Sequence, residues 1–240
     1  RNHDELDLGR LTEKQRQSVF AAFGPNPEDQ LYDRGIRRRL APMLGGDRRR
    51  LELAYSLMFT LPGTPVMRYG DELGMGDDLS LPERTCCRTP MQWSTEPNGG
   101  FTKSDKPVVP VISGGPYGFE HVNVAAQRRD NNSMLNWTER IIRMRKEVPE
   151  VGWGDFEILD TGTHTVLGMR YDWRNNSVLF LHNLDARPRE ISFSTGLRGE
   201  QGKLLVNLLT EDHSRANGRG RHDVLLEPYG YRWYRVGGLD

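Results

Sequence analysis

The first residues of the chain carry the side chains with the clearest chemical potential. The run Arg1-Asn2-His3-Asp4-Glu5 places an amide, an imidazole and two carboxylates side by side. Such a group can hold sugar hydroxyls, because each hydroxyl both donates and accepts a hydrogen bond. A carboxylate near C1 of a sugar can also stabilise the positive charge of an oxocarbenium-like transition state. Polar runs also occur at solvated chain termini. Other parts of the sequence are therefore needed to distinguish a sugar-binding site from a solvated terminus.

The charge and hydrophobicity of the chain limit the kinds of molecule that it can be expected to bind. Lys and Arg together number 33 and Asp and Glu together number 33, so no net field attracts nucleic acid or an anionic membrane. No apolar run approaches the ~20 residues of a membrane span. We therefore expect a neutral substrate or partner. We do not expect the chain to bind nucleic acid or a membrane. The chain opens with Arg1 and a dense polar motif, which indicates part of a longer protein.

The only two cysteines are the neighbours Cys86 and Cys87. A disulfide between adjacent residues is strained, so free thiols in a reducing compartment are expected, which indicates a cytoplasmic protein. A metal-binding pair and a redox switch remain the functional alternatives. No further Cys or His nearby completes a ligand set, so no metal site is predicted in this chain.

Two kinds of pattern divide the chain. Leu51, Ala54, Tyr55, Met58 and Leu61 recur at helical spacing after Asp47, a good N-cap, and Pro62-Gly63 ends this predicted helix. A strand over residues 64–69 follows, and then a long Gly- and Pro-rich loop over residues 76–116. A second helix begins near Ser133 and ends at Pro149. Helix, turn, strand and polar loop in this order are typical of an α/β barrel.

The remainder of the chain has the pattern of an all-β domain. Short apolar runs alternate with turn residues such as Asn175-Asn176 and Asn217-Gly218. We expect an antiparallel β-sandwich of ~80 residues, with its Trp and Tyr side chains in the core. The predicted strands are residues 178–181, 191–193, 204–208, 224–226 and 231–236.

Several motifs in a fixed order resemble one enzyme family. Asn2-His3-Asp4 is similar to the fourth short sequence region of glycoside hydrolase family 13, the α-amylase family, and other segments are similar to later parts of its sequence. These segments are Pro62–Met75, Arg88–Trp93, Val122–Val124 with Gln127-Arg128, and Glu227–Trp233. Two runs, Gly74–Asp78 and Arg37–Pro42, favour the trehalose synthase branch of the family. The run Leu81–Cys87 departs from the family's usual polar sequence, which leaves the exact substrate open.

The resemblance implies a fold and roles for particular residues. The fold is α/β plus all-β: the C-terminal part of a (β/α)8 TIM barrel over residues 1–148, then a β-sandwich over residues 149–240. Asp4 aligns with the carboxylate that stabilises the transition state, and His3 with a histidine that donates to sugar hydroxyls. Asn2 belongs to the same run and is predicted to bind substrate. His3 as a purely structural cap remains the alternative.

The resemblance also assigns residues outside the first run. Arg88 aligns with an arginine near the second sugar ring, a role that suits its fixed fork of donors. A surface ion pair is the alternative for this side chain. Asp71 and Glu72 are predicted at the border of the substrate pocket, with Asp71 as the substrate-binding residue, although both could equally anchor their loop by capping backbone N–H groups.

Two catalytic groups of the family are absent from this sequence. Retaining glycosidases need a nucleophile and an acid/base, which in this family stand on barrel strands that would precede Arg1. Asp4 and Glu5 cannot replace them, because adjacent side chains on a strand point to opposite faces. The isolated chain is therefore expected to be inactive.

The ligands and partners follow from the same resemblance. The expected substrates are α-linked glucosides such as maltose or trehalose, and the runner-up activity is that of an α-glucosidase or α-amylase. No cofactor is expected in this chain, and a calcium site of the family would lie before Arg1. As an alternative to an enzyme, the isolated chain could be a non-catalytic structural module. Its exposed strand edges would then be covered by a second copy in a homo-oligomer or by the missing N-terminal half.

Overall fold

The computed structural model describes residues 4–197 and 202–237. The chain divides into two compact units, one made of residues 1–51 and 66–140, the other of residues 52–65 and 141–240. Two of the three divisions, after residues 51 and 140, fall inside helices, and the third, after residue 65, does not. The boundary expected near residue 148 stays a prediction. No helix in the described ranges is long and apolar enough to span a membrane.

The first unit begins with a small antiparallel sheet and a helix. Strand β1 (Leu6–Asp7) pairs with β3 (Gly35–Ile36), which also pairs with β2 (Gln30–Leu31). Helix α1 (Glu13–Phe23) starts at Thr12, whose hydroxyl accepts from the Gln15 N–H while the Gln15 side chain accepts from the Thr12 N–H. Leu8, Phe20 and Ile36 form the buried core of this part. The sequence analysis did not identify these elements.

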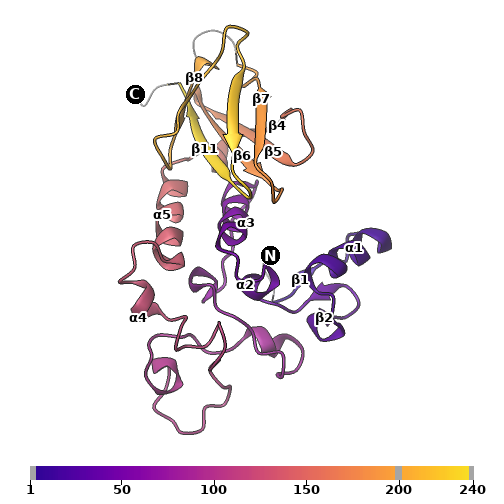
Figure 1. The fold of residues 1–240 in the computed structure, drawn as a ribbon, viewed down its shortest axis with the longest axis vertical. Coiled ribbons are helices and arrows are strands. Elements are labelled where there is room, and N and C mark those ends of the chain that lie inside the picture. The colour runs from indigo at the N-terminus through magenta and orange to yellow at the C-terminus, as the bar shows by residue number, and fades with distance from the viewer. Residues whose placement is uncertain (1–3, 198–201, 238–240) are drawn as a thin grey trace. The chain divides into compact units, whose positions relative to one another are not determined.

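Helix α2 (Leu40–Met43) leads into α3 (Arg48–Thr60), the helix expected after Asp47 (Figure 1). The Asp47 carboxylate caps this helix by accepting from the Arg49 and Arg50 N–H groups at 2.9 and 3.3 Å. Leu51 and Tyr55 are buried as predicted, whereas Leu61 is 43% exposed. The prediction of this helix and its N-cap is confirmed.

The strand expected over residues 64–69 is not observed. Residues 64–68 belong to no helix or strand. A barrel strand needs neighbouring strands to complete its hydrogen bonds, and no described strand lies beside this segment. Val66 is consequently 51% exposed. The prediction of a strand was therefore wrong.

The long loop after this segment is confirmed. Only short 3-10 turns interrupt it, at Asp71–Leu73, Glu83–Cys87 and Pro97–Gly100. Helix α4 (Val124–Gln127) and helix α5 (Met134–Lys146) follow, and α5 is the second predicted helix. Leu73, Met75, Met91 and Val124 form the buried cluster that fixes the loop.

The second unit contains the predicted antiparallel sheets (Figure 1). Helix α6 (Glu150–Trp153) precedes the strands of these sheets. A sheet of six strands has the order β4-β5-β6-β11-β8-β9, and a separate sheet pairs β10 with β7. The strands are β4 (Asp155–Leu159), β5 (Val166–Trp173), β6 (Asn176–Asn183), β7 (Arg189–Phe193), β8 (Leu204–Asn207), β9 (Ser214–Arg215), β10 (His222–Leu226) and β11 (Tyr231–Val236).

Side chains on one face of the six-stranded sheet pack with side chains of the smaller sheet. Leu179 and Leu181 of β6 belong to the same buried cluster as Phe193 of β7 and Leu226 of β10. The alternation of buried and exposed residues along β10 matches this arrangement, because successive side chains of a strand point to opposite faces. The predicted sandwich core is therefore confirmed.

The other face of the six-stranded sheet packs on the second half of α3. Trp233 Nε1 donates to Ser56 Oγ at 2.8 Å, and the Tyr171 hydroxyl donates to the Thr60 carbonyl at 2.7 Å. His182 Nε2 lies 2.9 Å from Ser56 Oγ, and the His182 side chain is fully buried. This packing explains why polar residues occupy the buried side of α3, a feature that the apolar stripe did not predict.

Candidate active site

Asp4 lies between two arginines from distant parts of the first unit. Arg88 Nε donates to Asp4 Oδ2 at 2.6 Å, and a second Arg88 nitrogen lies 2.5 Å from the same oxygen. Arg68 forms an ion pair with the other carboxylate oxygen, Oδ1. The hydrogen bond from Arg88 to this carboxylate raises the pKa of the Arg88 guanidinium. The two arginines therefore hold the Asp4 carboxylate in one orientation.

The predicted site residues are only partly brought together. Asp4 and Arg88 are in direct contact. Asp71 contacts Arg39 instead, and none of the contacts described for it joins the Asp4 cluster. Asn2 and His3 lie outside the described residues. Arg68 was not predicted, although it stands inside the motif Pro62–Met75 that was used to identify the family.

The segment that carries Arg68 is fixed by a buried arginine. Arg39 is 1% exposed, and its Nη1 donates to the Tyr69 carbonyl and to Asp71 Oδ1, both at 2.9 Å. The Tyr69 hydroxyl donates to the Thr89 carbonyl at 2.8 Å, which ties the segment to the residue after Arg88. Arg39 thus positions the backbone from which Arg68 reaches Asp4.

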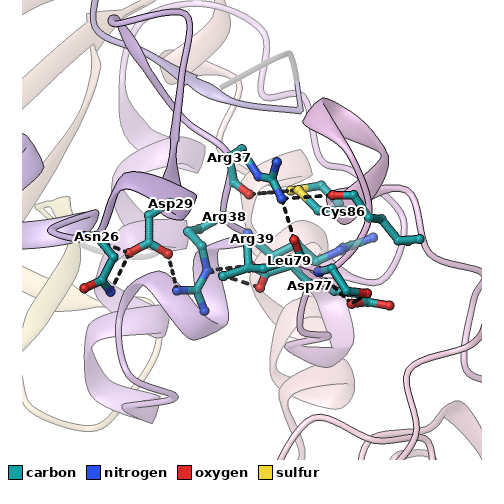
Figure 2. A network of polar contacts seen from close by, with 12 residues as sticks. Asn26, Asp29, Arg37, Arg38, Arg39, Asp77, Leu79 and Cys86 are labelled. Atoms are coloured by element: carbon teal, nitrogen blue, oxygen red, sulfur yellow. Dashed lines mark hydrogen bonds and ion pairs between the residues drawn. The ribbon is translucent and has the colours of Figure 1, made fainter.

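Arg39 belongs to a run of three arginines with different partners (Figure 2). Arg38 donates to both Asp77 oxygens at 3.1 and 3.0 Å and to Asp29 at 2.7 Å. Arg37 donates to the Leu79 and Leu81 carbonyls at 2.8 and 2.9 Å. Burial raises the pKa of the Asp77 carboxyl above its ordinary value, although Arg38 opposes this shift. The run was used only as a mark of the family branch, and its structural role was missed.

The two cysteines lie at the end of this network. Both are fully buried free thiols, and their sulfurs are 3.7 Å apart. Cys86 and Cys87 both donate to the Arg37 carbonyl, at 3.1 and 3.3 Å. Within residues 4–197 and 202–237, no group of at least three His, Cys, Asp or Glu side chains is placed to hold a metal ion. Burial and backbone contacts explain the adjacent thiols as packing residues.

The run that begins at Arg88 contains both buried and exposed side chains. Thr89 and Gln92 are fully buried, and Gln92 Nε2 donates to the Tyr117 and Val122 carbonyls at 3.1 and 2.6 Å. Trp93, by contrast, is 45% exposed. The buried members fix the backbone, so that Arg88 points toward Asp4 from a rigid loop.

Comparisons with known proteins agree with the motifs. Residues 36–154 match the model of the α-amylase catalytic domain, and residues 176–235 match the model of the sucrose hydrolase-like C-terminal domain. The trehalose synthase of Thermus thermophilus is 38% identical over 239 residues, which are 98% of this chain and 24% of that protein. The trehalose synthase of Pimelobacter sp. is 36% identical over 98% of this chain and 42% of its own length.

The fold has solved counterparts as well. The trehalulose synthase MutB from Pseudomonas mesoacidophila MX-45 has a TM-score of 0.64 and 21% identity, over 83% of this chain and 41% of that chain. This likeness confirms the predicted fold class, part of a TIM barrel followed by an antiparallel β domain. The chain spans less than half the length of these relatives. The chain belongs to the α-amylase family of glycoside hydrolases, and over nearly its whole length it is similar to part of the trehalose synthases.

Proposed function

We propose that this chain forms part of an enzyme that interconverts maltose and trehalose through a glycosyl-enzyme intermediate. In this proposal Asp4 stabilises the oxocarbenium-like transition state. The nucleophile and the acid/base come from a part of the full-length enzyme outside this sequence. The observation that carries the proposal is the contact of Asp4 with Arg68 and Arg88, in a chain that is 38% identical to a trehalose synthase over 98% of its length.

The charges around Asp4 suit this role. Two guanidinium groups fix the orientation of the Asp4 carboxylate, so this group needs no reorganisation when positive charge develops at C1. Arg88 is the more accessible arginine, because its side chain is 55% exposed, whereas that of Arg68 is 18% exposed. Arg88 can therefore contact the departing glucose while Arg68 keeps Asp4 in place.

The reaction type depends on how water is excluded. An isomerase must retain the free glucose and rejoin it through a different hydroxyl, so water must not reach the covalent intermediate. The loop over residues 76–116 carries Arg88 and would form part of the closed pocket. An α-glucosidase, the second candidate, would leave this pocket more open.

Product analysis of the full-length enzyme tests the proposal. Maltose should be converted mainly to trehalose, with glucose as a minor product, as measured by chromatography of timed incubations. Arg88→Ala should raise the fraction of glucose, because the departing sugar loses its contact. A matched Arg84→Ala variant removes a neighbouring arginine that pairs with Glu5 rather than Asp4, and its products should stay unchanged. Glucose as the main product of the unmodified enzyme would establish the α-glucosidase alternative instead.

A further inference from the structure

The two adjacent cysteines form a second reactive feature of the first unit. Cys86 Sγ lies 3.7 Å from Cys87 Sγ, and both side chains are fully buried. A buried thiol packs like a small apolar side chain, so packing alone does not require two sulfurs in contact. The pair stands in the run of residues 81–87 that departs from the family's sequence, and the role of Asp4 does not account for it.

The two thiols are turned toward each other by a shared acceptor. Cys86 and Cys87 donate to the same Arg37 carbonyl, at 3.1 and 3.3 Å (Figure 2 shows Cys86 beside Arg37). The hydrogen bond with Cys87 lowers the pKa of the Cys86 thiol below its ordinary value, although burial opposes this shift. A thiolate beside a second thiol is the arrangement in which a sulfenic acid is converted into a disulfide.

The pair lies beneath a short turn that separates it from solvent. Both cysteines belong to the 3-10 helix Glu83–Cys87, and Cys86 Sγ also donates to the Glu83 carbonyl at 3.1 Å. Ser80 and Glu83 are exposed, and Glu83 has a φ of +47°, a left-handed conformation that is unfavourable for a residue with a Cβ. Opening this single turn would admit a small oxidant while the rest of the fold stays intact.

A disulfide between these neighbours would be strained and therefore reversible. Successive Cα atoms across a trans peptide are about 3.8 Å apart, whereas disulfides usually need at least about 4.4 Å. The peptide between Cys86 and Cys87 would have to rotate and distort to close the bond. Strained disulfides are readily reduced by other thiols, so the pair would return to the thiol form once the oxidant is removed.

Rotation of this peptide would reach the candidate active site directly. The Cys86 carbonyl accepts from the Asp78 N–H at 2.9 Å, and the Arg88 N–H donates to the Thr85 carbonyl at 2.8 Å. These two hydrogen bonds flank the peptide that has to move. Arg88 is the next residue in the chain, and its Nε donates to Asp4 Oδ2 at 2.6 Å. Closing the disulfide would therefore displace Arg88 from Asp4.

We propose that Cys86 and Cys87 are a site of reversible two-electron oxidation by a hydroperoxide, and that the resulting disulfide draws Arg88 away from Asp4. The Cys86 sulfur attacks a peroxide oxygen, an S–O bond forms, the O–O bond breaks, and water leaves with the thiol proton. The Cys87 sulfur then attacks the Cys86 sulfenic acid, an S–S bond forms, and the hydroxyl leaves as a second water. The pair is oxidised and the peroxide is reduced. The effect on catalysis rests on the proposed function, whereas the oxidation does not.

Mass spectrometry tests the oxidation without reference to activity. The full-length enzyme is treated with hydrogen peroxide, its free thiols are alkylated after denaturation, and the peptide that carries Cys86 and Cys87 is analysed without reduction. This peptide should lose two hydrogen atoms and resist alkylation, and dithiothreitol should restore both thiols. Two alkylated cysteines, or sulfonic acids in place of a disulfide, would overturn the proposed site.

Kinetics test the link from the disulfide to Arg88. Peroxide should lower the kcat of the unmodified enzyme for maltose by at least about tenfold, because Arg88 loses its position, and dithiothreitol should restore it. Dithiothreitol does not reverse methionine oxidation, so recovery assigns the loss to the thiols. Cys87→Ser, which keeps the shape of the side chain, should retain its kcat under the same treatment, and Cys87→Ala serves the same purpose if the hydroxyl disturbs folding.

Two kinetic outcomes would overturn the link to Arg88. One is a disulfide that forms without loss of kcat, and the other is an equal loss in the Cys87 variants. If the unmodified enzyme makes no trehalose from maltose, the proposed function fails, whereas the mass measurement still decides whether the cysteine pair is oxidised.

Discussion

Arginine is used in two different ways around the candidate site. Arg88 and Arg68 stand at the accessible end and hold the Asp4 carboxylate from both sides. Arg39 is buried behind them and binds backbone as well as a carboxylate. A guanidinium suits both tasks because its donors are fixed in one plane and its charge is permanent. A lysine at either position would offer a single flexible charge and would fix neither the carboxylate nor the backbone.

The contact between Arg39 and Asp71 favours the anchoring role for Asp71 over a direct role in substrate binding. Asp71→Asn removes the charge partner of a buried guanidinium, so the free energy of unfolding should fall by roughly 3 kcal/mol. The KM for maltose of the folded full-length enzyme should stay within about threefold. Urea denaturation and initial rates measure the two quantities.

The matched variant for this test is Asp33→Asn, at an exposed position. It should change neither the free energy of unfolding nor the KM. A large rise in KM for Asp71→Asn, with unchanged stability, would instead support the pocket-border role that the sequence motif predicted.

At the scale of elements, the second half of α3 packs on the six-stranded sheet of the same unit through a buried polar cluster. Ser56 receives the indole N–H of Trp233 and lies within hydrogen-bond distance of His182 Nε2. Phe180 packs edge-on against Trp233, with ring centroids 5.2 Å apart. Complete burial of His182 lowers its pKa to about 3, because the charged imidazolium is poorly solvated there. The histidine is therefore neutral in the folded state.

This neutral histidine makes the stability of the second unit depend on pH. Its folded pKa of about 3 lies below the ordinary value of 6.5, so between these pH values the unfolded chain binds more protons. Stability is therefore full above pH 6.5 and falls as the pH falls toward 3, by at most about 1.4 kcal/mol per pH unit. Between pH 7 and pH 5 this contribution amounts to about 2 kcal/mol.

Urea denaturation of His182→Gln at several pH values checks this expectation. The variant should be less stable at pH 7, but its free energy of unfolding should fall less between pH 7 and pH 5 than that of the unmodified protein. His164→Gln, at an exposed position, should keep the original pH dependence. An unchanged pH dependence in His182→Gln would show that His182 does not account for the acid sensitivity.

The sequence predicted the elements that have strong local signals. Asp47 followed by an apolar stripe identified α3, and short apolar runs identified strands such as β6 and β10. The β4 and β5 strands were missed, because exposed residues fill β4 and because Arg170 and Asp172 interrupt the apolar residues of β5. The segment 64–69 has a strand pattern, but a pattern does not supply the neighbouring strands on which a ladder depends.

At the scale of the molecule, the site depends on contacts between residues far apart in sequence. Asp4 and Arg88 were each predicted from a motif, but their contact spans 84 positions and no local pattern indicates it. Arg39 was missed as a residue that supports the site, because its role follows from burial rather than from residue type.

The chain is similar to less than half of each trehalose synthase compared above. In the proposed function this chain therefore contributes one catalytic carboxylate, and the bond-breaking groups come from the rest of the full-length enzyme. Under this division of roles, loss of Asp4 should abolish turnover without unfolding the protein.

The most direct test compares Asp4→Asn with the unmodified full-length enzyme in the conversion of maltose. The account predicts that kcat falls by at least ~10²-fold, because a preorganised charge is lost from the transition state, while the melting temperature changes little. Asp7→Asn, at an exposed position of β1, serves as the matched control and should keep its kcat. A normal kcat in Asp4→Asn, together with a large drop in melting temperature, would contradict the account and show that Asp4 is a structural partner of Arg68 and Arg88.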